Sequence, residues 1–527
     1  MTKPWEPPAS FNLAHYFLDH NLEAGRGAKV ALRTEVRDWT YAELHAESCR
    51  VSDLLRRFGV RYEERVLLAV SDGPEFVATW FGVLRAGAVF AMVNPLLPAE
   101  DYAYYLEYTR CSIAVVDAQV AEKLREHLPD ARHLRCLVVV GGEPRGLKNA
   151  VSYDREVARS SASPHCADTS PDDLAGWLFT SGSTGKPKAV VHLHRDFAYN
   201  TEHYAKQVLG FRESDVTLSI SKLFFGYGTG TNLMFPFAVG ATTVLFPDRP
   251  TPERLFELIE RFRPTVLTAV PTSIGAMLEH PLAKETRDLS SLRCVLSAGE
   301  ALPPELLQRW MQRFGVEILD GIGSAEMFHI YISNYPGEVV AGSLGKLVPG
   351  YEARIVDDAG RDVPDGEVGL LHVRGGSTGL WYHGAYEKSR ETFHGAWCRT
   401  QDFFRRDAEG RFWYQGRSDD LLKVGGIFVS PLEIEDCLLQ HPQVLECCVV
   451  GADDEGGLVK PFAWVVPQPG VARDEVLRES VKGWVRERLA RYKFPRWVGF
   501  LEALPRNDRG KVARKELRAR AAAEEKR

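Results

Sequence analysis

The sequence predicts an α/β fold: a large N-terminal domain of doubly wound sheets, a small β-barrel subdomain, and a small α+β domain at the C-terminus. Three observations support this fold class. Strand-like and helix-like segments alternate between residues 65 and 300, which is typical of parallel sheets covered by helices. After about residue 345, short strands separated by Gly, Asp and Pro favour a barrel or meander. From Asp420 onward, strands and helices alternate again in a compact α+β pattern.

The N-terminal elements carry clear boundary signals. Thr40 is suited to cap a helix, Glu43 would complete a capping box, and Gly59 would end that helix. The apolar run over 65–70 predicts a strand. A helix is predicted over 74–85, because proline is tolerated in a first turn, where its missing N–H has no helical partner.

The same patterns place the remaining elements. In the large domain we expect strands at 113–117, 137–140, 177–179, 189–191, 216–220, 243–246, 265–270 and 292–297, and helices at 11–20, 195–209 and 252–262. Beyond it we expect strands at 352–356, 369–374, 412–415, 444–450 and 462–466, and helices at 431–440 and 475–489. Residues 514–527 are rich in charge and are expected to fray.

Composition narrows the class of protein. The chain has 527 residues, 45% of them hydrophobic and 26% charged, which is ordinary for a globular enzyme of several domain-sized units. The net charge of −6 is spread without long like-charge blocks, so nothing favours nucleic acid or an anionic membrane as a partner. Nine cysteines without a Cys-x-x-Cys pair, and no apolar run of membrane-spanning length, predict a cytoplasmic protein. Either a monomer or a homodimer is expected.

The segment Thr180 to Lys188 has the chemistry of a phosphate site. It holds two glycines, four hydroxyl groups and two lysines between two apolar strands. Glycine tolerates the backbone dihedrals that aim several N–H groups at one anion, and the hydroxyls and lysines add donors and charge. It differs from the P-loop of nucleotide triphosphatases, since Pro187 follows Lys186 where that motif requires Ser or Thr. The sequence therefore predicts a different kind of triphosphate loop.

These residues resemble the phosphate loop of the adenylate-forming superfamily of acyl- and aryl-CoA synthetases, adenylation domains and luciferases, and further matches resemble its benzoate–CoA ligase branch. The resemblance implies an N-terminal domain over 1–418, with two α/β subdomains and a β-barrel subdomain from about 345, and a mobile C-terminal domain over 419–527. It also implies that the ATP phosphates are bound by Thr180, Ser181, Gly182, Ser183, Thr184, Gly185, Lys186 and Lys188.

A second motif runs from Asp320 to Glu326. Its two glycines would let backbone lie close to a planar ligand, and the Glu326 carboxylate could hold Mg²⁺ through oxygen. The family usually has Tyr-Gly-x-Thr-Glu at this point, and this chain has Ile322 for the tyrosine and Ala325 for the threonine. The resemblance implies that the adenine and ribose site comprises Ala298, Gly299, Glu300, Asp320, Gly321, Ile322, Gly323, Ser324, Ala325, Asp402 and Arg417. Gln401 replaces a family glycine beside the ribose-binding Asp402.

The C-terminal motifs resemble the catalytic-lysine loop, the hinge and the CoA channel of the family's mobile domain. The resemblance implies that Lys511, after Leu-Pro-Arg-Asn, is the catalytic lysine, a mobile charge acting together with the metal-binding Glu326. It places the hinge between the two domains at Asp419. It implies a CoA channel formed by Lys423, Gly425 and Gly426.

The acid-binding pocket is predicted from an aromatic cluster. Phe225, Gly226 and Tyr227 stand where many relatives have a Leu-Phe-His run, and His329 and Ile330 follow the metal-binding glutamate. The resemblance to the benzoate–CoA ligases implies that the tyrosine, histidine and isoleucine enclose an aromatic ring. Gly226 would leave space beside that ring for an ortho amino or hydroxyl group.

We therefore expect an ATP-dependent aryl-CoA ligase, an acid–thiol ligase that uses ATP, Mg²⁺ and CoA. It would activate benzoate or a substituted benzoate, with 2-aminobenzoate as a candidate, as acyl-AMP with release of pyrophosphate. Three alternatives stay open: an aryl adenylation enzyme that loads an acyl carrier protein, a long-chain fatty acyl–CoA ligase, and a non-catalytic nucleotide-binding relative. The bulky aromatic pocket argues against the second, and Lys511, Glu326 and Asp402 together argue against the third.

Overall fold

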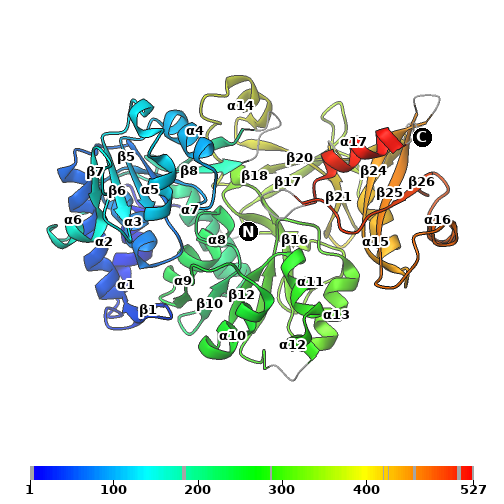
Figure 1. The fold of residues 1–527 in the computed structure, drawn as a ribbon, viewed down its shortest axis with the longest axis horizontal. Helices are drawn as coiled ribbons and strands as arrows, with labels where there is room; N and C mark the ends of the chain where they lie inside the picture. The colour runs from blue at the N-terminus through cyan, green and yellow to red at the C-terminus, as the bar shows by residue number, and fades with distance from the viewer. Residues whose placement is uncertain are drawn as a thin grey trace.

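The hairpin around the predicted phosphate loop closes one edge of a seven-stranded sheet in the computed structural model, which describes residues 5–180, 186–284, 288–418, 420–424, 427–454, 458–506 and 512–524. The strand order is β7-β6-β5-β3-β4-β8-β9. All neighbours are parallel except the pair β8–β9, which is an antiparallel hairpin. Figure 1 shows this sheet in blue to cyan. The bounds are β3 Arg65–Ala69, β4 Val89–Met92, β5 Ile113–Asp117, β6 Cys136–Val140, β7 Ala150–Ser152, β8 Leu174–Thr180 and β9 Lys188–Leu193.

A nine-stranded sheet forms the second α/β layer, in the order β16-β15-β14-β13-β12-β10-β11-β1-β2. Its central strands are parallel, and β2, β15 and β16 add antiparallel edges. Two such sheets confirm the doubly wound fold that alternation in the sequence predicts. The bounds are β1 Val30–Arg33, β2 Asp38–Thr40, β10 Val216–Ser219, β11 Thr242–Val244, β12 Val266–Ala269, β13 Cys294–Ser297, β14 Ile318–Gly323, β15 Ile330–Ser333 and β16 Lys346–Leu347.

Helices cover these sheets, and α2 and α3 begin where the sequence predicts. Helix α2 has the expected capping box, in which the Thr40 side chain accepts from the Glu43 N–H. Helix α3 starts with proline at its N-terminus as expected. The main helices are α2 Tyr41–Arg57, α3 Pro74–Arg85, α4 Ala99–Thr109, α5 Ala118–Leu124, α6 Tyr153–Ala158, α7 His194–Asn200, α8 Gly226–Thr229, α10 Pro252–Phe262, α11 Pro271–Glu279 and α13 Pro304–Phe314.

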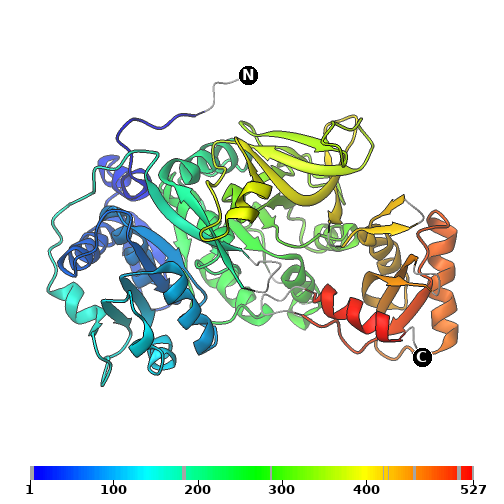
Figure 2. The same cartoon turned by 90° about the horizontal axis from the view of Figure 1, so that it is seen from above.

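The short strands after residue 345 form a five-stranded antiparallel sheet, which Figure 2 shows in yellow beside the two large sheets. It occupies the region where the sequence predicts a barrel or meander. Its elements are β17 Glu352–Val356, β18 Gly369–Arg374, α14 Tyr386–Thr392, β19 Phe393–His394, β20 Trp397–Arg406 and β21 Phe412–Arg417.

The C-terminal residues form a separate lobe with its own core, at one end of the molecule in both views (Figures 1 and 2). A three-stranded sheet, β24-β25-β26, lies between helices and is preceded by the hairpin β22–β23. The elements are β22 Leu422–Val424, β23 Ile427–Val429, α15 Pro431–Leu439, β24 Val444–Asp453, β25 Val459–Pro467, α16 Glu475–Arg488, β26 Trp497–Phe500 and α17 Arg514–Glu524.

The prediction that residues 514–527 fray is wrong for the described part of that segment. Residues 514–524 form helix α17, and its Leu517 and Ala521 are fully buried. The Leu517 carbonyl accepts from the Trp464 indole N–H at 3.0 Å, and Arg514 pairs with the buried Glu435 at 2.7 Å. Two apolar side chains and one buried ion pair therefore hold a helix whose other side chains are mostly charged.

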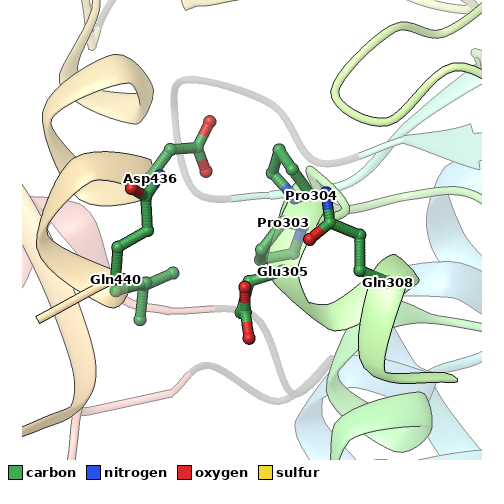
Figure 3. A pocket seen from close by; sticks show the side chains of 7 residues that line it. Pro303, Pro304, Glu305, Gln308, Asp436 and Gln440 are labelled. Atoms are coloured by element: carbon green, nitrogen blue, oxygen red, sulfur yellow. The ribbon is translucent and has the colours of Figure 1, made fainter. Parts of the chain in front are cut away.

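The lobes meet at a polar groove of about 280 Å³ between α13 and α15 (Figure 3). Pro303, Pro304, Glu305 and Gln308 line one side, and Asp436, Leu439 and Gln440 line the other. Burial, with smaller contributions from the neighbouring Glu435 and Glu433, raises the pKa of Asp436 to about 7. A carboxylate at this interface therefore titrates near neutral pH.

We expect Asp436→Asn to stabilise the protein by about 1–2 kcal/mol more at pH 8 than at pH 5. Between pH 3.8, the ordinary pKa, and about pH 7, the folded protein keeps a proton on Asp436 that the unfolded chain has released. The free energy of unfolding therefore falls as pH rises through that window. Thermal unfolding at both pH values measures the effect, with Asp453→Asn, an exposed carboxylate of β24, as control. A stabilisation equal at both pH values would contradict the assignment.

Two further features concern membrane-spanning helices and the state of the cysteines. Across the described ranges, no helix combines the length and the apolar character that crossing a membrane requires. All nine cysteines are free thiols, and seven of them are buried.

Candidate active site

The hairpin of β8 and β9, which we call the phosphate hairpin, has two lysines that lie over aromatic rings. Strands β8 and β9 pair so that Thr180 faces Lys188 across the hairpin. The Lys186 Nζ lies 4.9 Å from the ring centroid of Tyr104, and the Lys188 Nζ lies 5.0 Å from that of Tyr382. Both are cation–π distances. The loop residues Ser181, Gly182, Ser183, Thr184 and Gly185 lie outside the described residues, and their roles stay predictions.

Residues 377–383, which we call the bridging segment, join this hairpin to the turn that carries Glu326. On one side the segment lies along β9, where the backbone N–H and carbonyl of Val191 both bond to it, at 3.0 and 2.9 Å. On the other side the Gly379 N–H donates to the Glu326 carbonyl at 2.7 Å. The bridging segment thus fixes the Glu326 turn relative to the phosphate hairpin, although the two are far apart in sequence.

Glu326 lies in a short 3₁₀ turn, η5 Ala325–Met327, and is half-buried. Its Oε1 accepts a hydrogen bond from the Tyr382 hydroxyl at 2.6 Å. Tyr382 is the same side chain whose ring lies under Lys188. A carboxylate, a tyrosine and a lysine therefore form one contiguous group, in which the two predicted ATP-binding charges share a partner.

The Glu326 carboxylate fits one kind of metal site. The described residues contain no group of three or more His, Cys, Asp or Glu side chains that could enclose an ion. Mg²⁺, however, is usually held by one or two carboxylates together with substrate phosphates and water. A single half-buried carboxylate beside a phosphate hairpin suits an ion that arrives with a nucleotide.

A buried imidazole–carboxylate pair, missed by the sequence reasoning, supports the same turn. The Nε2 of His192 donates to the Ala325 carbonyl at 2.7 Å, and its Nδ1 lies 2.8 Å from Asp196 Oδ2. Both side chains are almost fully buried. The only sequence signal is a His and an Asp four residues apart where β9 runs into α7. Their contact fixes the backbone that immediately precedes Glu326.

The glycines of β14 have a packing role that differs from the predicted one. A Cβ on Gly321 would lie 2.8 Å from the Ile332 carbonyl oxygen, and one on Gly323 would lie 2.5 Å from that of His329. Close pairing with β15 therefore requires glycine at both positions, whether or not a ligand lies nearby. Ile322 between them packs against the large core, and Asp320 at the strand's buried end has its pKa raised to about 8 by burial.

The predicted adenine surface contacts the C-terminal lobe. Ala298, Gly299 and Glu300 follow β13, and a carboxylate oxygen of Glu300 accepts from the backbone N–H and the hydroxyl of Thr272, at 3.1 and 2.7 Å. The Arg506 guanidinium donates to the same hydroxyl at 3.3 Å. Lys511 lies outside the described residues, but Arg506 and Val512, on either side of it, pair as a β-bridge. The base of the predicted lysine loop is thus held against the predicted nucleotide site.

The predicted ribose residues lie on paired strands. Asp402 on β20 faces Arg417 on β21, with Arg417 Nε 3.8 Å from Asp402 Oδ1. The departure from the family at Gln401 has a local role, because its Oε1 accepts from Arg417 Nη2 at 2.8 Å. The predicted hinge residue Asp419 lies outside the described residues. So do Gly425 and Gly426 of the predicted CoA channel, and of Lys423 only the backbone, in β22, is described.

The predicted aryl pocket assembles around His329, which is buried next to Ile330. Its Nε2 donates to the Tyr227 carbonyl at 3.2 Å, and the two rings lie 5.3 Å apart. Burial lowers the pKa of His329 to about 3, so the imidazole is neutral at physiological pH. Gly226 lies beside this pair, whereas Phe225 is 36% exposed. The residues predicted to line the pocket are therefore mainly aromatic, and their imidazole is uncharged.

One glycine that the sequence reasoning missed makes room for the His329 ring. A Cβ on Gly230, in the π-helical turn η4 Gly230–Met234, would lie 2.4 Å from Cδ2 of the His329 ring. The ring packs against bare backbone at this point. The signal in the sequence was the spacing Gly226, Gly228, Gly230, of which only the first was interpreted as part of the pocket.

Comparison with known proteins places this chain in a family. Residues 18–383 match the family model described as AMP-binding enzyme, and residues 433–511 match that of the AMP-binding enzyme C-terminal domain. A benzoate–CoA ligase of Thauera aromatica is 42% identical over 514 residues, which cover 97% of this chain and 96% of that protein.

Two solved structures share the fold over nearly the whole chain. An anthranilate CoA ligase in complex with anthranoyl-AMP superposes with a TM-score of 0.92 at 39% identity, covering 98% of both chains. A benzoate CoA ligase from Burkholderia xenovorans superposes with a TM-score of 0.88 at 40% identity, covering 96% of this chain and 100% of the other. These likenesses confirm the superfamily and the enzyme class that the sequence motifs predict. The chain belongs to the AMP-binding family of adenylate-forming enzymes and is an AMP-forming acid–thiol ligase.

Proposed function

We propose that the protein activates benzoate or an ortho-substituted benzoate, with 2-aminobenzoate as the leading candidate, as acyl-AMP and then transfers the aryl group to CoA. The observation that carries this proposal is the proximity of two sites. The Lys188–Tyr382–Glu326 group is suited to a metal-bound triphosphate, and His329, three residues after Glu326, is an uncharged ring packed against Tyr227.

In the first step, an oxygen of the aryl carboxylate attacks the α-phosphorus of ATP, and pyrophosphate leaves. Lys186 and Lys188, held at the base of the hairpin, offer positive charge to the phosphates. Glu326 would hold Mg²⁺, which when bound neutralises charge on the phosphate oxygens. Lys511 supplies a further charge at the reacting oxygens. The neutral pocket orients the acid by packing and leaves its carboxylate as the one anionic group to be positioned.

In the second step, the C-terminal lobe turns about Asp419 and withdraws Lys511. The CoA thiol then attacks the acyl-AMP carbonyl, its sulfur forms the thioester bond, and AMP leaves. The groove between α13 and α15 supports this motion, since the lobes are separated there by a gap lined by two carboxylates, two amides, two prolines and Leu439. Gly425 and Gly426 are proposed to let the pantetheine arm pass close to the backbone.

The identity of the acid is tested by pyrophosphate release with benzoate, 2-aminobenzoate, 2-hydroxybenzoate and 4-hydroxybenzoate. We expect benzoate and the two ortho-substituted acids to be activated more efficiently than the para-substituted acid. Activation of 4-hydroxybenzoate alone, or of none of the four, would contradict the proposal.

The variant Gly226→Ala tests the role of this glycine directly. A Cβ at this position would lie 3.5 Å from Leu178 Cδ1 and 3.7 Å from the Phe328 carbonyl, which are ordinary contact distances, so the protein should fold normally. The added methyl group is expected to lower kcat/KM for 2-aminobenzoate by about tenfold, because a pocket discriminates one carbon by roughly that amount, with little effect on benzoate. Steady-state kinetics with both acids and a melting curve check this. Equal losses for the two acids would contradict it.

An acyl carrier protein remains the second candidate for the acceptor. Thioester formation from purified acyl-AMP, offered CoA or a phosphopantetheinyl carrier protein, distinguishes the two. We expect CoA to be the better acceptor, because the relatives that match over the whole chain carry CoA ligase activity in their names.

A further inference from the structure

The aromatic side chain of Tyr382 contacts both charges of the predicted nucleotide site. Its hydroxyl donates to Glu326 Oε1 at 2.6 Å, and its ring lies 5.0 Å from the Lys188 Nζ. We propose that Tyr382 is a positioning residue that sets the Glu326 carboxylate and the Lys188 ammonium in one geometry for a metal-bound nucleotide. This inference rests on the proposed function, since it concerns how the same site takes up MgATP.

The backbone around Tyr382 holds the side chain in place from several directions. Tyr382 forms an isolated antiparallel bridge with Val190, and on its C-terminal side the His383 N–H donates to the Ala189 carbonyl at 2.9 Å. The Tyr382 ring also packs against Phe393 with centroids 5.3 Å apart, and the residue is 6% exposed. Because Tyr382 is fixed against β9, its hydroxyl holds the Glu326 carboxylate at a defined position relative to that strand.

The Glu326 backbone is held independently of that hydroxyl. The N–H of Gly379 donates to the Glu326 carbonyl, the Ser377 hydroxyl donates to the Met327 carbonyl at 2.8 Å, and His192 bonds to the Ala325 carbonyl. Removing the Tyr382 hydroxyl should therefore leave the turn in place and free only the carboxylate. This separates a positioning role from a purely structural one.

The Tyr382 hydroxyl forms a charge-assisted hydrogen bond that orients the Glu326 carboxylate. The Tyr382 hydroxyl donates and the Glu326 carboxylate accepts, at 2.6 Å. A hydrogen bond to a carboxylate is roughly twice as strong as a neutral one, and it restricts rotation of the carboxylate. Among the described residues, no other hydrogen bond to the Glu326 side chain is formed, so its second oxygen is available to a cation.

The Tyr382 ring also stabilises the charge of Lys188. Burial lowers the pKa of Lys188, the nearby Lys388 lowers it further, and Glu326 opposes both. The face of the Tyr382 ring carries negative electrostatic potential, which offsets part of the cost of holding an ammonium group in this half-buried place. The tyrosine thus contacts two opposite charges at once, the carboxylate through its hydroxyl and the ammonium through its ring.

The experiment compares Tyr382→Phe and Tyr382→Leu with the wild-type protein by calorimetric titration of ATP at a series of Mg²⁺ concentrations, without any acid. For Tyr382→Phe we expect the Mg²⁺ concentration that gives half-maximal ATP affinity to rise by about tenfold, with binding of metal-free AMP and the melting temperature little changed. Tyr382→Leu, which also removes the ring, should weaken ATP binding further even at saturating Mg²⁺.

The control is Tyr335→Phe, which removes a hydroxyl that donates to the Leu347 carbonyl at 3.0 Å outside the nucleotide site and should bind as the wild type does. An unchanged Mg²⁺ dependence in Tyr382→Phe, or equal losses for MgATP and AMP, would overturn the positioning role. Failure of the wild-type protein to bind MgATP would instead overturn the proposed function, so the two failures are distinguishable.

Discussion

The variant Glu326→Gln is expected to lower pyrophosphate release by about 100-fold or more, the range found when one charge-stabilising group is removed from an active site. The amide has the same shape and its oxygen still accepts from the Tyr382 hydroxyl, so the turn should keep its geometry. What it loses is the negative charge that would hold Mg²⁺. Pyrophosphate release across a range of Mg²⁺ concentrations measures the effect, and high Mg²⁺ should restore part of the rate.

A surface carboxylate provides the control for this variant. Glu338 pairs with Lys346 at 2.7 Å, away from the site, and Glu338→Gln should keep the wild-type rate. A Glu326→Gln protein that folds normally and releases pyrophosphate within about threefold of the wild-type rate would show that the carboxylate is not a metal ligand.

The variant Lys511→Ala is expected to lose adenylate formation by about 100- to 1,000-fold while keeping thioester formation from supplied acyl-AMP. The physical reason is that a lysine charge near the α-phosphate is needed only while negative charge develops there. The contact of Arg506 with Thr272 holds the base of the lysine loop against the predicted adenine surface, as the first step requires. Pyrophosphate release measures one half-reaction, and CoA consumption with synthetic acyl-AMP measures the other.

Lys515 provides a matched control, because it lies in the first turn of α17 and its side chain is exposed. Lys515→Ala should change neither half-reaction by more than about twofold. Equal losses in both half-reactions for Lys511→Ala would contradict its assignment to the first step alone.

The parts of the fold that depend on local chemistry were accessible from the sequence. The Thr40–Glu43 capping box and the proline at the start of α3 are set by neighbouring residues, and both are confirmed. The two strands that flank the phosphate loop were likewise predictable, since each is a continuous apolar run.

The features of the site and fold that depend on contacts between distant residues could not be predicted from the sequence. Tyr382 approaches Lys188 and Glu326 only because the bridging segment lies along β9, and no local pattern announces a pairing between residues nearly 200 positions apart. His192 is similar, since its partner Ala325 lies in the turn η5 between β14 and β15, more than 130 residues further along the chain. Helix α17 was wrongly expected to fray because its buried face consists of only Leu517 and Ala521, too few to produce a clear amphipathic pattern.

The packing of α17 has a practical consequence for anyone who shortens or labels this polypeptide. Because Trp464 and Glu435 bond to that helix, deleting it would uncover an apolar face on β24 and β25 and leave a buried carboxylate without its arginine. A purification tag therefore belongs beyond Glu524. A stop codon before Arg514 should yield insoluble material even though the sequence up to Lys511 is intact.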